Sequence, residues 1–399
     1  MKQDPIKNAL AIPWHRDPGV RALIFQTLLL LVVVWSLGTI FSNTVTNLES
    51  RGIHTGFDFL HEIAPFAVGF SPFIEFKLGE STYWDVFLIG IQNTMIVSFL
   101  GIVAATLLGF IIGIMRLSPN WLVSKIASVY IETFRNIPLL LQIMFWNFAI
   151  FLPNLPGPRQ SLSLGDTVFL NSRGLYMPQP VTQSEVGAWI MIIVSIAAFI
   201  GCVLLYRWAR RRKDQTGQSF PILWVSLAIM ALVPTLAYFM TGSPIGAELP
   251  ELKRFNFEGG MQMPLPLFSL WFALSTYTAA FIGETVRGGI MAVDHGQTEA
   301  ANALGLHRGK VLRLVVIPQA LRVIIPPAIS QFLNLTKNSS LAVAVAYEEL
   351  VSIWSGIALN QTGQALVIIA MTIVVYEVLS LMTSAILNFY NYRIQLVER

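Results

Sequence analysis

The chain has 399 residues, of which 54% are hydrophobic and only 12% are charged. Soluble domains carry roughly 25% charged residues, so this composition excludes an ordinary soluble protein and indicates one that crosses a membrane several times. The net charge of +4 does not indicate nucleic-acid binding, because the basic residues are scattered in short loops between apolar runs. The single cysteine, Cys202, lies within an apolar run, which excludes a disulfide framework and a thiol metal site.

Eight segments are apolar over roughly the 17–25 residues that cross a bilayer, or nearly so. In chain order they lie near 22–41, 86–114, 137–152, 187–206, 220–241, 267–290, 326–350 and 365–390. The third is short, and Pro138 at its start suits the first turn of a helix. The predicted fold class is an all-α polytopic membrane protein with about 8 transmembrane helices.

The distribution of Lys and Arg predicts how these spans are oriented. With a cytoplasmic N-terminus, the inner segments hold 19 of the 26 basic residues and the outer loops hold 6, while Lys337 lies within a span. The inner group includes the run Arg210-Arg211-Arg212-Lys213, which is typical of a stop-transfer anchor. We therefore expect the N- and C-termini to be cytoplasmic.

Clusters of Pro and Gly divide the chain unevenly, because such clusters mark loops and boundaries. One stretch opens on a Pro-rich cluster at 153–158 and closes on a Gly- and Pro-rich cluster at 259–266. The expected parts are an N-terminal cytoplasmic segment with the first transmembrane helix and a periplasmic loop (1–85), a first part of the core (86–152), an insertion with two extra transmembrane helices (153–266) and a second part of the core (267–399).

The loop at 294–318 contains a short helix of soluble character between two apolar spans. Asp294 can cap its start, with Gln297 three residues later reaching back to form a capping box. Glu299 lies in the first turn, where the helix dipole favours an anion.

The same helix has an almost flat side and a defined end. Ala300, Ala301 and Ala303 supply the flat side, and Gly305 stands where a left-handed residue would terminate the helix. A rigid, flat helix of this kind suits docking against another protein. The simpler interpretation is a solvated connector helix.

Longer motifs surround this loop, at 276–290 (TYTAAFIGETVRGGI), 314–322 (LVVIPQALR), 337–341 (KNSSL) and 130–142 (YIETFRNIPLLLQ). Together with the loop they resemble the permease subunits of polar amino-acid ABC importers, the histidine/glutamine/arginine permease family. The long form of the chain is most similar to the general L-amino-acid permeases of Gram-negative bacteria. The resemblance covers the core and does not extend to the insertion.

The resemblance implies a type I, MetI-like importer fold and the transport of amino acids across a bacterial inner membrane. It implies four partners: a second homologous permease subunit, a cytoplasmic ABC ATPase dimer that binds ATP and Mg, a periplasmic amino-acid-binding protein and membrane lipid, with no nucleic acid. The loop at 294–318 would be the EAA coupling loop on which the ATPase docks, through Asp294, Gly296, Gln297, Glu299, Ala300, Ala301 and Gly305.

The absence of other motifs agrees with this interpretation. The sequence lacks Gly-x-x-x-x-Gly-Lys-Ser/Thr, and the run from Gly305 through Gly309 and Lys310 has neither the spacing nor the final hydroxyl. No His or Cys pair has metal-ligand spacing, and no Ser/His/Asp order stands out among the 5 histidines. The chain is expected to be no enzyme and to hold no cofactor or metal of its own.

Polar side chains within spans are candidates for a transport path, because they are costly in hydrocarbon. An α-amino acid needs acceptors for its ammonium group and donors for its carboxylate, and Lys337 with Asn338 could supply the donors. The alternative is hydrogen bonding between core helices. The candidate residues are Gln142, Thr276, Tyr277, Asn334, Lys337 and Asn338.

A further group of residues suggests a structural or gating role. Glu284 and Arg287 are three residues apart on one helix and can pair near its cytoplasmic end, and Pro318 belongs to the same group by its motif. The sequence names no partner for three further acids in or near the last two spans, which are Glu348, Glu349 and Glu377.

Two other function classes remain open. A secondary transporter would show internal repeats, broken half-helices and ion-coordinating acids, whereas Gly and Pro in this chain cluster mainly in loops and motifs. A membrane scaffold or receptor would need neither the coupling loop nor polar residues at mid-membrane. Substrate flux without ATP, or no flux at all, would favour one of these classes.

Overall fold

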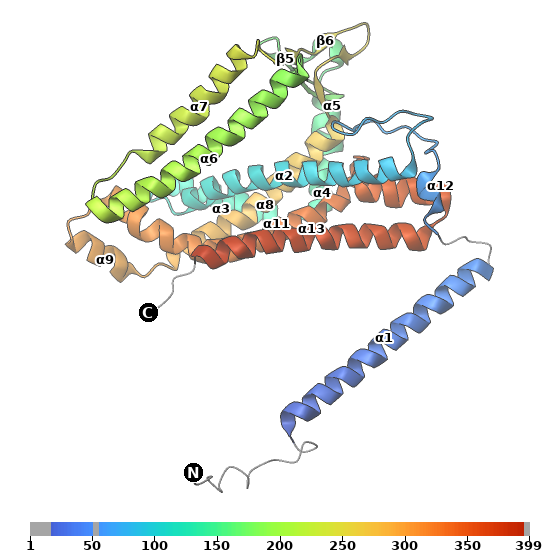
Figure 1. Cartoon of the computed structure of the whole chain (residues 1–399), viewed down its shortest axis with the longest axis horizontal. Helices are drawn as coiled ribbons and strands as arrows, with labels where there is room; N and C mark the ends of the chain where they lie inside the picture. The colour runs from blue at the N-terminus through green and yellow to red at the C-terminus, as the bar shows by residue number, and fades with distance from the viewer. Residues whose placement is uncertain (1–16, 51–55, 395–399) are drawn as a thin grey trace.

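The computed structural model describes residues 17–50 and 56–394, and most of these are helical (Figure 1). Within them, 7 helices are long and apolar enough to cross a membrane, or up to 8 if one bent pair counts as a single span. The predicted fold class and span number are confirmed. The longer helices are α1 (Pro18–Ser50), α2 (Tyr83–Arg116), α3 (Trp121–Asn136), α6 (Glu185–Thr216), α7 (Ile222–Met240), α8 (Leu265–Met291), α11 (Ile317–Asn338) and α13 (Ala365–Ile394).

Shorter helical segments connect these helices and, in places, continue them. Both chain ends lie outside the described residues, so the cytoplasmic location predicted for them stays a prediction. The short segments are η1 (Asp58–His61), α4 (Leu139–Met144), η2 (Phe145–Phe151), α5 (Leu152–Asn154), η3 (Pro158–Gln160), α9 (His295–Ala303), α10 (Arg308–Val311), η4 (Leu312–Val316), η5 (Ser339–Val345), η6 (Leu350–Ala358) and α12 (Leu359–Thr362).

Helices α2 and α8 form the centre of the core and pack with their backbones close together. A β-carbon added at Gly109 would lie 2.6 Å from the side chain of Ile282, and one added at Gly113 would lie 2.7 Å from that of Val286. The spacing of the two glycines is the small-xxx-small pattern that lets membrane helices approach. Helices α3 and α11 pack against this pair.

The third predicted span, 137–152, is helical as α4, η2 and α5, with Pro138 directly before its first residue. The sequence did not indicate the sharp bend that separates it from α3. Helix α3 and the run from α4 to α5 meet at an angle of 106°. A proline disfavours the helical conformation at the residue before it. Ile137, which precedes Pro138, is accordingly extended, with φ −95° and ψ 129°. Gln142 stabilises the bend, since its Nε2 donates to the carbonyl oxygens of Phe134 and Ile137, both at 2.9 Å.

The insertion contains two helices and three small antiparallel sheets. Helices α6 and α7 pack against each other, and the strands lie at one end of the pair (Figure 1). One sheet has the order β1-β2-β3-β8, and the other two are the pairs β4-β5 and β6-β7. The strands are β1 (Leu162–Leu164), β2 (Val168–Asn171), β3 (Gly174–Met177), β4 (Gln179–Thr182), β5 (Ile245–Glu248), β6 (Glu251–Leu252), β7 (Phe257–Glu258) and β8 (Met261–Pro264).

These strands were not predicted, since they are short and lie in stretches that read as loops. Pairing of β3 with β8 brings the two ends of the insertion together directly before α8, with Tyr176 opposite Gln262. This pairing is what a separate unit between α5 and α8 would require, and we propose that 153–266 forms such a unit. Helix α1, by contrast, lies apart from this body, and no residue of its apolar span is buried (Figure 1).

Candidate coupling and transport site

Helix α9 lies at one end of the molecule (Figure 1), and a side chain caps its start. Asp294 Oδ1 accepts a hydrogen bond from the Gly296 backbone N–H at 2.7 Å, so the predicted cap is present. The reciprocal half of the predicted capping box is not observed in the described residues. Gln297 turns to α11 instead, where its Oε1 accepts from Gln319 Nε2 at 3.5 Å.

The end of α9 is fixed by Gly305, which is left-handed with φ +73° as predicted. The Gly305 N–H donates to the Asn302 carbonyl oxygen at 2.9 Å, and the Leu306 N–H donates to that of Ala301 at 3.2 Å. This pair of bonds is the Schellman motif, which satisfies carbonyl groups at a helix end. Both ends of α9 are therefore held by local contacts.

One alanine of the predicted flat side faces the protein. Ala301 is buried and packs with Val311 and Val316, so it anchors α9 to the following segment. The His295 Nδ1 lies 3.1 Å from Glu299 Oε1 on the opposite, exposed side. The remaining predicted coupling residues are all exposed, namely Asp294, Gly296, Gln297, Glu299, Ala300 and Gly305.

A charged cluster links the ends of α2, α3 and α8. The predicted pair is present, since Arg287 Nη2 lies 2.6 Å from Glu284 Oε1. Glu284 also pairs with Arg116, the last residue of α2, and Arg116 lies 3.9 Å from Glu132 on α3. The sequence did not indicate Arg116 as a partner, because it precedes Glu284 by a long stretch of chain. Pro318 lies where η4 continues into α11 without leaving the helical conformation. Because proline has no N–H, it removes one backbone hydrogen bond from this helical run.

Two of the substrate-path candidates have structural roles in this chain. Gln142 is buried and holds the bend between α3 and α4, with its Oε1 unpartnered among the described residues. The carbonyl oxygen of Thr276 accepts from Tyr130 Oη at 2.7 Å, which joins α8 to α3. Tyr277 packs its ring 4.9 Å from that of Phe281. The Gln142 contacts agree with the alternative of hydrogen bonding within the core. Thr276 meets Tyr130 only through its backbone, and its Oγ1 donates to the Phe272 carbonyl oxygen of the same helix at 2.8 Å.

The other three candidates lie together near the end of α11. Asn334 and Lys337 are exposed and Asn338 is half-buried. Among the described residues, no hydrogen bond or ion pair joins any two of the six candidates. The ammonium group of Lys337 is therefore on the surface of the single chain and not enclosed by it.

The acids that lacked a partner in the sequence have distinct environments. Glu348 Oε2 accepts from two backbone N–H groups of the loop before α2, at 2.8 and 3.0 Å. Glu349 is fully buried and accepts from Tyr376 Oη at 2.8 Å and from the Ser352 N–H at 2.9 Å. Glu377, in contrast, is exposed on α13. The first two join the core helices to each other and to the loop before α2.

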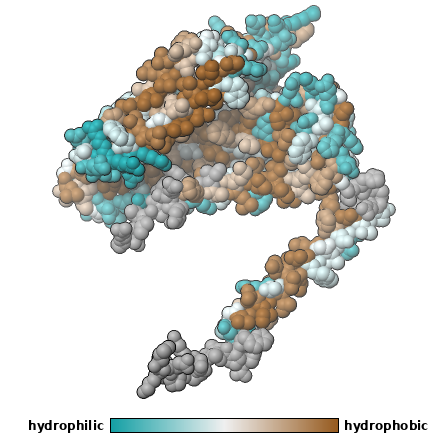
Figure 2. All heavy atoms as spheres, in the orientation of Figure 1, coloured by the Kyte–Doolittle hydropathy of each residue, from teal (hydrophilic) through white to brown (hydrophobic). Residues whose placement is uncertain are grey.

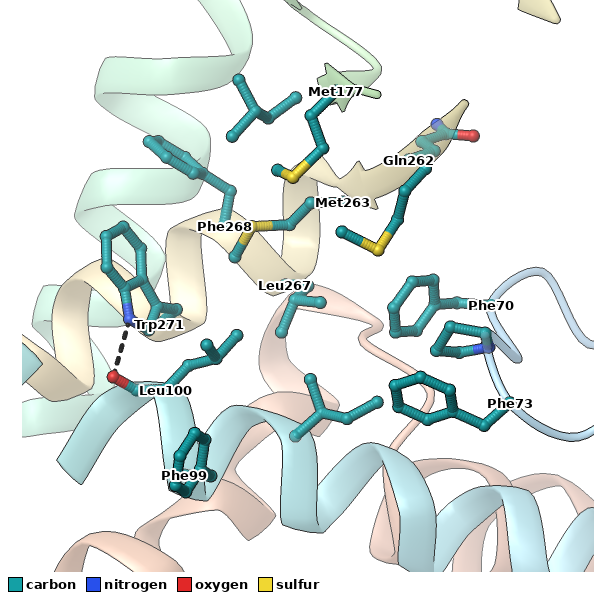
Figure 3. Close-up of a pocket in the computed structure, with 14 residues that line it drawn as sticks. Phe70, Phe73, Phe99, Leu100, Met177, Gln262, Met263, Leu267, Phe268 and Trp271 are labelled. Atoms are coloured by element: carbon teal, nitrogen blue, oxygen red, sulfur yellow. Dashed lines mark hydrogen bonds between the residues drawn. The ribbon is translucent and has the colours of Figure 1, made fainter. Parts of the chain in front are cut away.

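An apolar cavity of about 480 Å³ lies where the insertion meets the core (Figure 3). Phe70 and Phe73 reach it from the loop before α2, Met263 from β8 and Trp271 from α8. Trp271 Nε1 donates to the Leu100 carbonyl oxygen at 3.1 Å. The charged groups of an amino acid need hydrogen-bonding partners when buried, so this cavity does not suit them. It is the packing junction between insertion and core.

The fold and the exposed, capped helix α9 together indicate the class of protein. The chain is a multi-pass helical protein. The loop at 294–318, which we predict to be cytoplasmic, presents a short capped helix between two spans. Residues 211–395 match the family of binding-protein-dependent transport system inner membrane components. The class is therefore that of inner-membrane transport components, and the chain is a multi-pass inner-membrane protein.

Full-length relatives narrow this class. The chain is 47% identical to the putative amino-acid ABC transporter permease protein YhdX of Escherichia coli (strain K12), over 100% of this chain and 99% of that protein. It is 45% identical to the general L-amino acid transport system permease protein AapQ of Rhizobium johnstonii, over 96% and 94%. The chain belongs to the family of amino-acid ABC transporter permeases, as its motifs predicted.

A third full-length relative agrees with this family. The chain is 38% identical to the glutamate/glutamine/aspartate/asparagine transport system permease protein BztB of Rhodobacter capsulatus, over 96% of each chain. Among solved structures, it resembles an amino acid ABC transporter crystallised with histidines, with a TM-score of 0.46 and 19% identity, over 78% of this chain and 95% of that one.

Proposed function

We propose that this chain is one membrane subunit of an importer that moves amino acids into the cell, driven by ATP hydrolysis on a separate subunit. A second homologous permease completes the transmembrane pathway, and a periplasmic binding protein delivers the amino acid. ATP and Mg are bound by a cytoplasmic ATPase dimer. This chain supplies no catalytic residue and no cofactor.

The observation that carries the proposal is the form of α9. A helix of nine residues is too short to be stable by itself in water, yet α9 is capped at both ends and anchored through Ala301. Its other proposed coupling residues remain free for a partner. A helix with this support can dock on an ATPase and move as a rigid unit.

The charged cluster offers a route from α9 into the core. Helix α8 leads from Glu284 to the start of α9, and Glu284 pairs with Arg116 on α2. A movement of α9 would therefore displace α8 and would be transmitted to α2 and α3 through these ion pairs. We assign Glu284, Arg287 and Pro318 a structural role in this transmission.

Changes in α9 test the proposal. A side chain added at Gly305 meets no atom within 4 Å, so Gly305→Val introduces only the cost of a left-handed β-branched residue, about 1–2 kcal/mol. We expect it to change the end of α9 while the spans still assemble. Glu299→Lys reverses an exposed charge on the docking side. Both variants should abolish ATP-driven uptake of radiolabelled amino acid into vesicles that contain the complete complex.

Two controls separate coupling from general damage. Gly201→Val on α6 also adds a side chain into open space, but without a positive φ. Glu251→Lys reverses an exposed charge in the β-strand region. Both should leave uptake unchanged. Wild-type uptake and wild-type stimulation of ATP hydrolysis in the two α9 variants would show that 294–318 is only a connector.

A further inference from the structure

Helices α6 and α7 present an apolar surface away from the rest of the chain. The only buried residues of α6 are Gly187, Ala198 and Ala209, and the only one of α7 is Ala237. Figure 2 shows the resulting hydrophobic surface along the two helices, with a hydrophilic patch at the end nearest α9. A helix that is apolar nearly all round is typical of a membrane span, and nothing in the rest of the described chain covers this surface.

The hydrophilic patch contains a run of basic residues directly beyond the apolar surface. Tyr206 and Trp208 are exposed where the apolar stretch of α6 ends, as is typical of aromatic residues at the headgroup level. The acid nearest to the run is Asp214. The basic residues are Arg207, Arg210, Arg211, Arg212 and Lys213.

One of these arginines has an internal role. The guanidinium group of Arg212 lies 5.4 Å from the centre of the Trp208 ring, and its Nη2 donates to Gln218 Oε1 at 2.9 Å. The Trp208 ring in turn meets that of Phe220 edge-on at 5.5 Å. Arg212 therefore holds the connection between α6 and α7.

Three other arginines are free for a ligand and lie on one face of α6. Arg207, Arg210 and Arg211 are related by the spacing i, i+3, i+4, which places side chains on the same side of a helix. All three are exposed, and in the described part of the chain none of them forms an ion pair. Ala209, between them in sequence, is buried, so the arginine face is turned away from the protein.

We propose that Arg207, Arg210 and Arg211 form a binding site for the phosphate headgroups of anionic phospholipids, in the leaflet at the α9 end of the molecule. A guanidinium group offers paired donors that fit phosphate oxygens. The acyl chains of the same lipid would lie along the adjacent apolar surface of α6, so one continuous surface matches both parts of the ligand. A stop-transfer anchor requires only positive charge, whereas this run uses arginine at three positions of one face.

The proposal is tested by lipid selectivity, which requires neither ATP nor an amino acid and so is independent of the proposed function. The purified chain is placed in vesicles of roughly four parts phosphatidylcholine to one part phosphatidylglycerol. Spin-labelled forms of each lipid report the fraction that the protein restricts. We expect phosphatidylglycerol to be preferred about fivefold at about 0.15 M salt, and the preference to fall at about 1 M salt because the charges are screened.

The variant that neutralises the three arginines, Arg207→Gln with Arg210→Gln and Arg211→Gln, should reduce this preference to near one. The matched control neutralises three basic residues of the β-strand region, Arg159→Gln with Lys253→Gln and Arg254→Gln, and should keep the wild-type preference. Arg210→Gln alone serves if the triple variant gives too little folded protein, and should lower the preference measurably.

Two results would overturn the proposal. One is an unchanged phosphatidylglycerol preference in the arginine variants, and loss of binding to the purified ATPase subunit in the same variants would then identify a protein-docking surface instead. The other is an equal loss of preference in the control triple, because that would show a response to total charge and not to this site.

Discussion

At the residue scale, identical side chains have different roles because their surroundings differ. Glu284 lies between two arginines and joins helices by ion pairs. Glu349 is fully buried, no ion pair is formed with it in the described part of the chain, and its oxygens accept from a tyrosine hydroxyl and a backbone N–H. Glu377 is exposed and holds no such contact among the described residues. Glu284 and Glu349 thus have structural contacts that Glu377 lacks in the described residues, because their burial and their neighbours differ.

At the same scale, Lys337 is the residue for which we predict an effect on transport. An unpaired ammonium group within a span costs roughly 2.5–3.5 kcal/mol on insertion scales, and Lys337 is exposed without an ion pair among the described residues. Lys337→Met removes the charge and keeps most of the volume. We expect normal assembly and strongly reduced uptake, measured by transport in vesicles and by co-purification of the complex.

The matched control for this prediction is Lys125→Met, which removes an exposed lysine from α3. It should leave uptake close to the wild-type level. Normal uptake by an assembled Lys337→Met complex would rule out a role for the ammonium group in binding or gating.

At the scale of the elements, close packing of glycines decides how the core holds together. Helices α2 and α8 approach so closely at Gly109 and Gly113 that a β-carbon at either position would overlap the partner helix. The ion pair between Arg116 and Glu284 lies just beyond this contact. Separating the helices would therefore weaken both the packing and the charged cluster.

Gly113→Leu tests the contact between α2 and α8. The added side chain must displace Val286 and the backbone of α8, and overpacking of this kind costs about 1–3 kcal/mol or more. We expect a lower midpoint of thermal unfolding in detergent and a lower yield of assembled complex. Gly201→Leu on α6, where no atom lies within 4 Å, should change neither. Equal stability of the two variants would mean that α2 and α8 are not packed as described.

At the scale of the whole molecule, the insertion is attached to the core without entering it. The helices of this segment expose most of their side chains, its strands pair through β3 and β8, and an apolar cavity lies between it and the core (Figure 3). The polar candidates of the transport path lie on α4, α8 and the end of α11. We therefore predict that α6 and α7 lie outside the substrate path.

Cysteine labelling tests this arrangement, and the single native cysteine makes it practicable. Ile193 and Leu232 are exposed on the two apolar helices. In a Cys202→Ala background, new cysteines at these positions should resist a membrane-impermeant maleimide if the helices lie against lipid. A cysteine at Asn334 should react and should be protected by substrate. Reactivity at Ile193 or Leu232 that substrate blocks would place the insertion in the path.

The sequence by itself determined the features that depend on local chemistry. Long apolar runs identified the membrane spans, since each buries its own backbone hydrogen bonds within one helix. The ends of α9 followed from Asp294 and Gly305, because a side-chain cap and a left-handed glycine act within a few residues. The motifs around them identified the family that the full-length relatives confirm.

Only the tertiary structure decided which distant groups meet. The bend of 106° before α4, the pairing of Arg116 with Glu284, the enclosure of Glu349 and the inward side of Ala301 all depend on contacts between separate elements. The strands of the insertion form for the same reason, since each short strand acquires its hydrogen bonds from a partner elsewhere in the chain. Local propensity is the same for many arrangements of these residues, and long-range packing and hydrogen bonding select one of them.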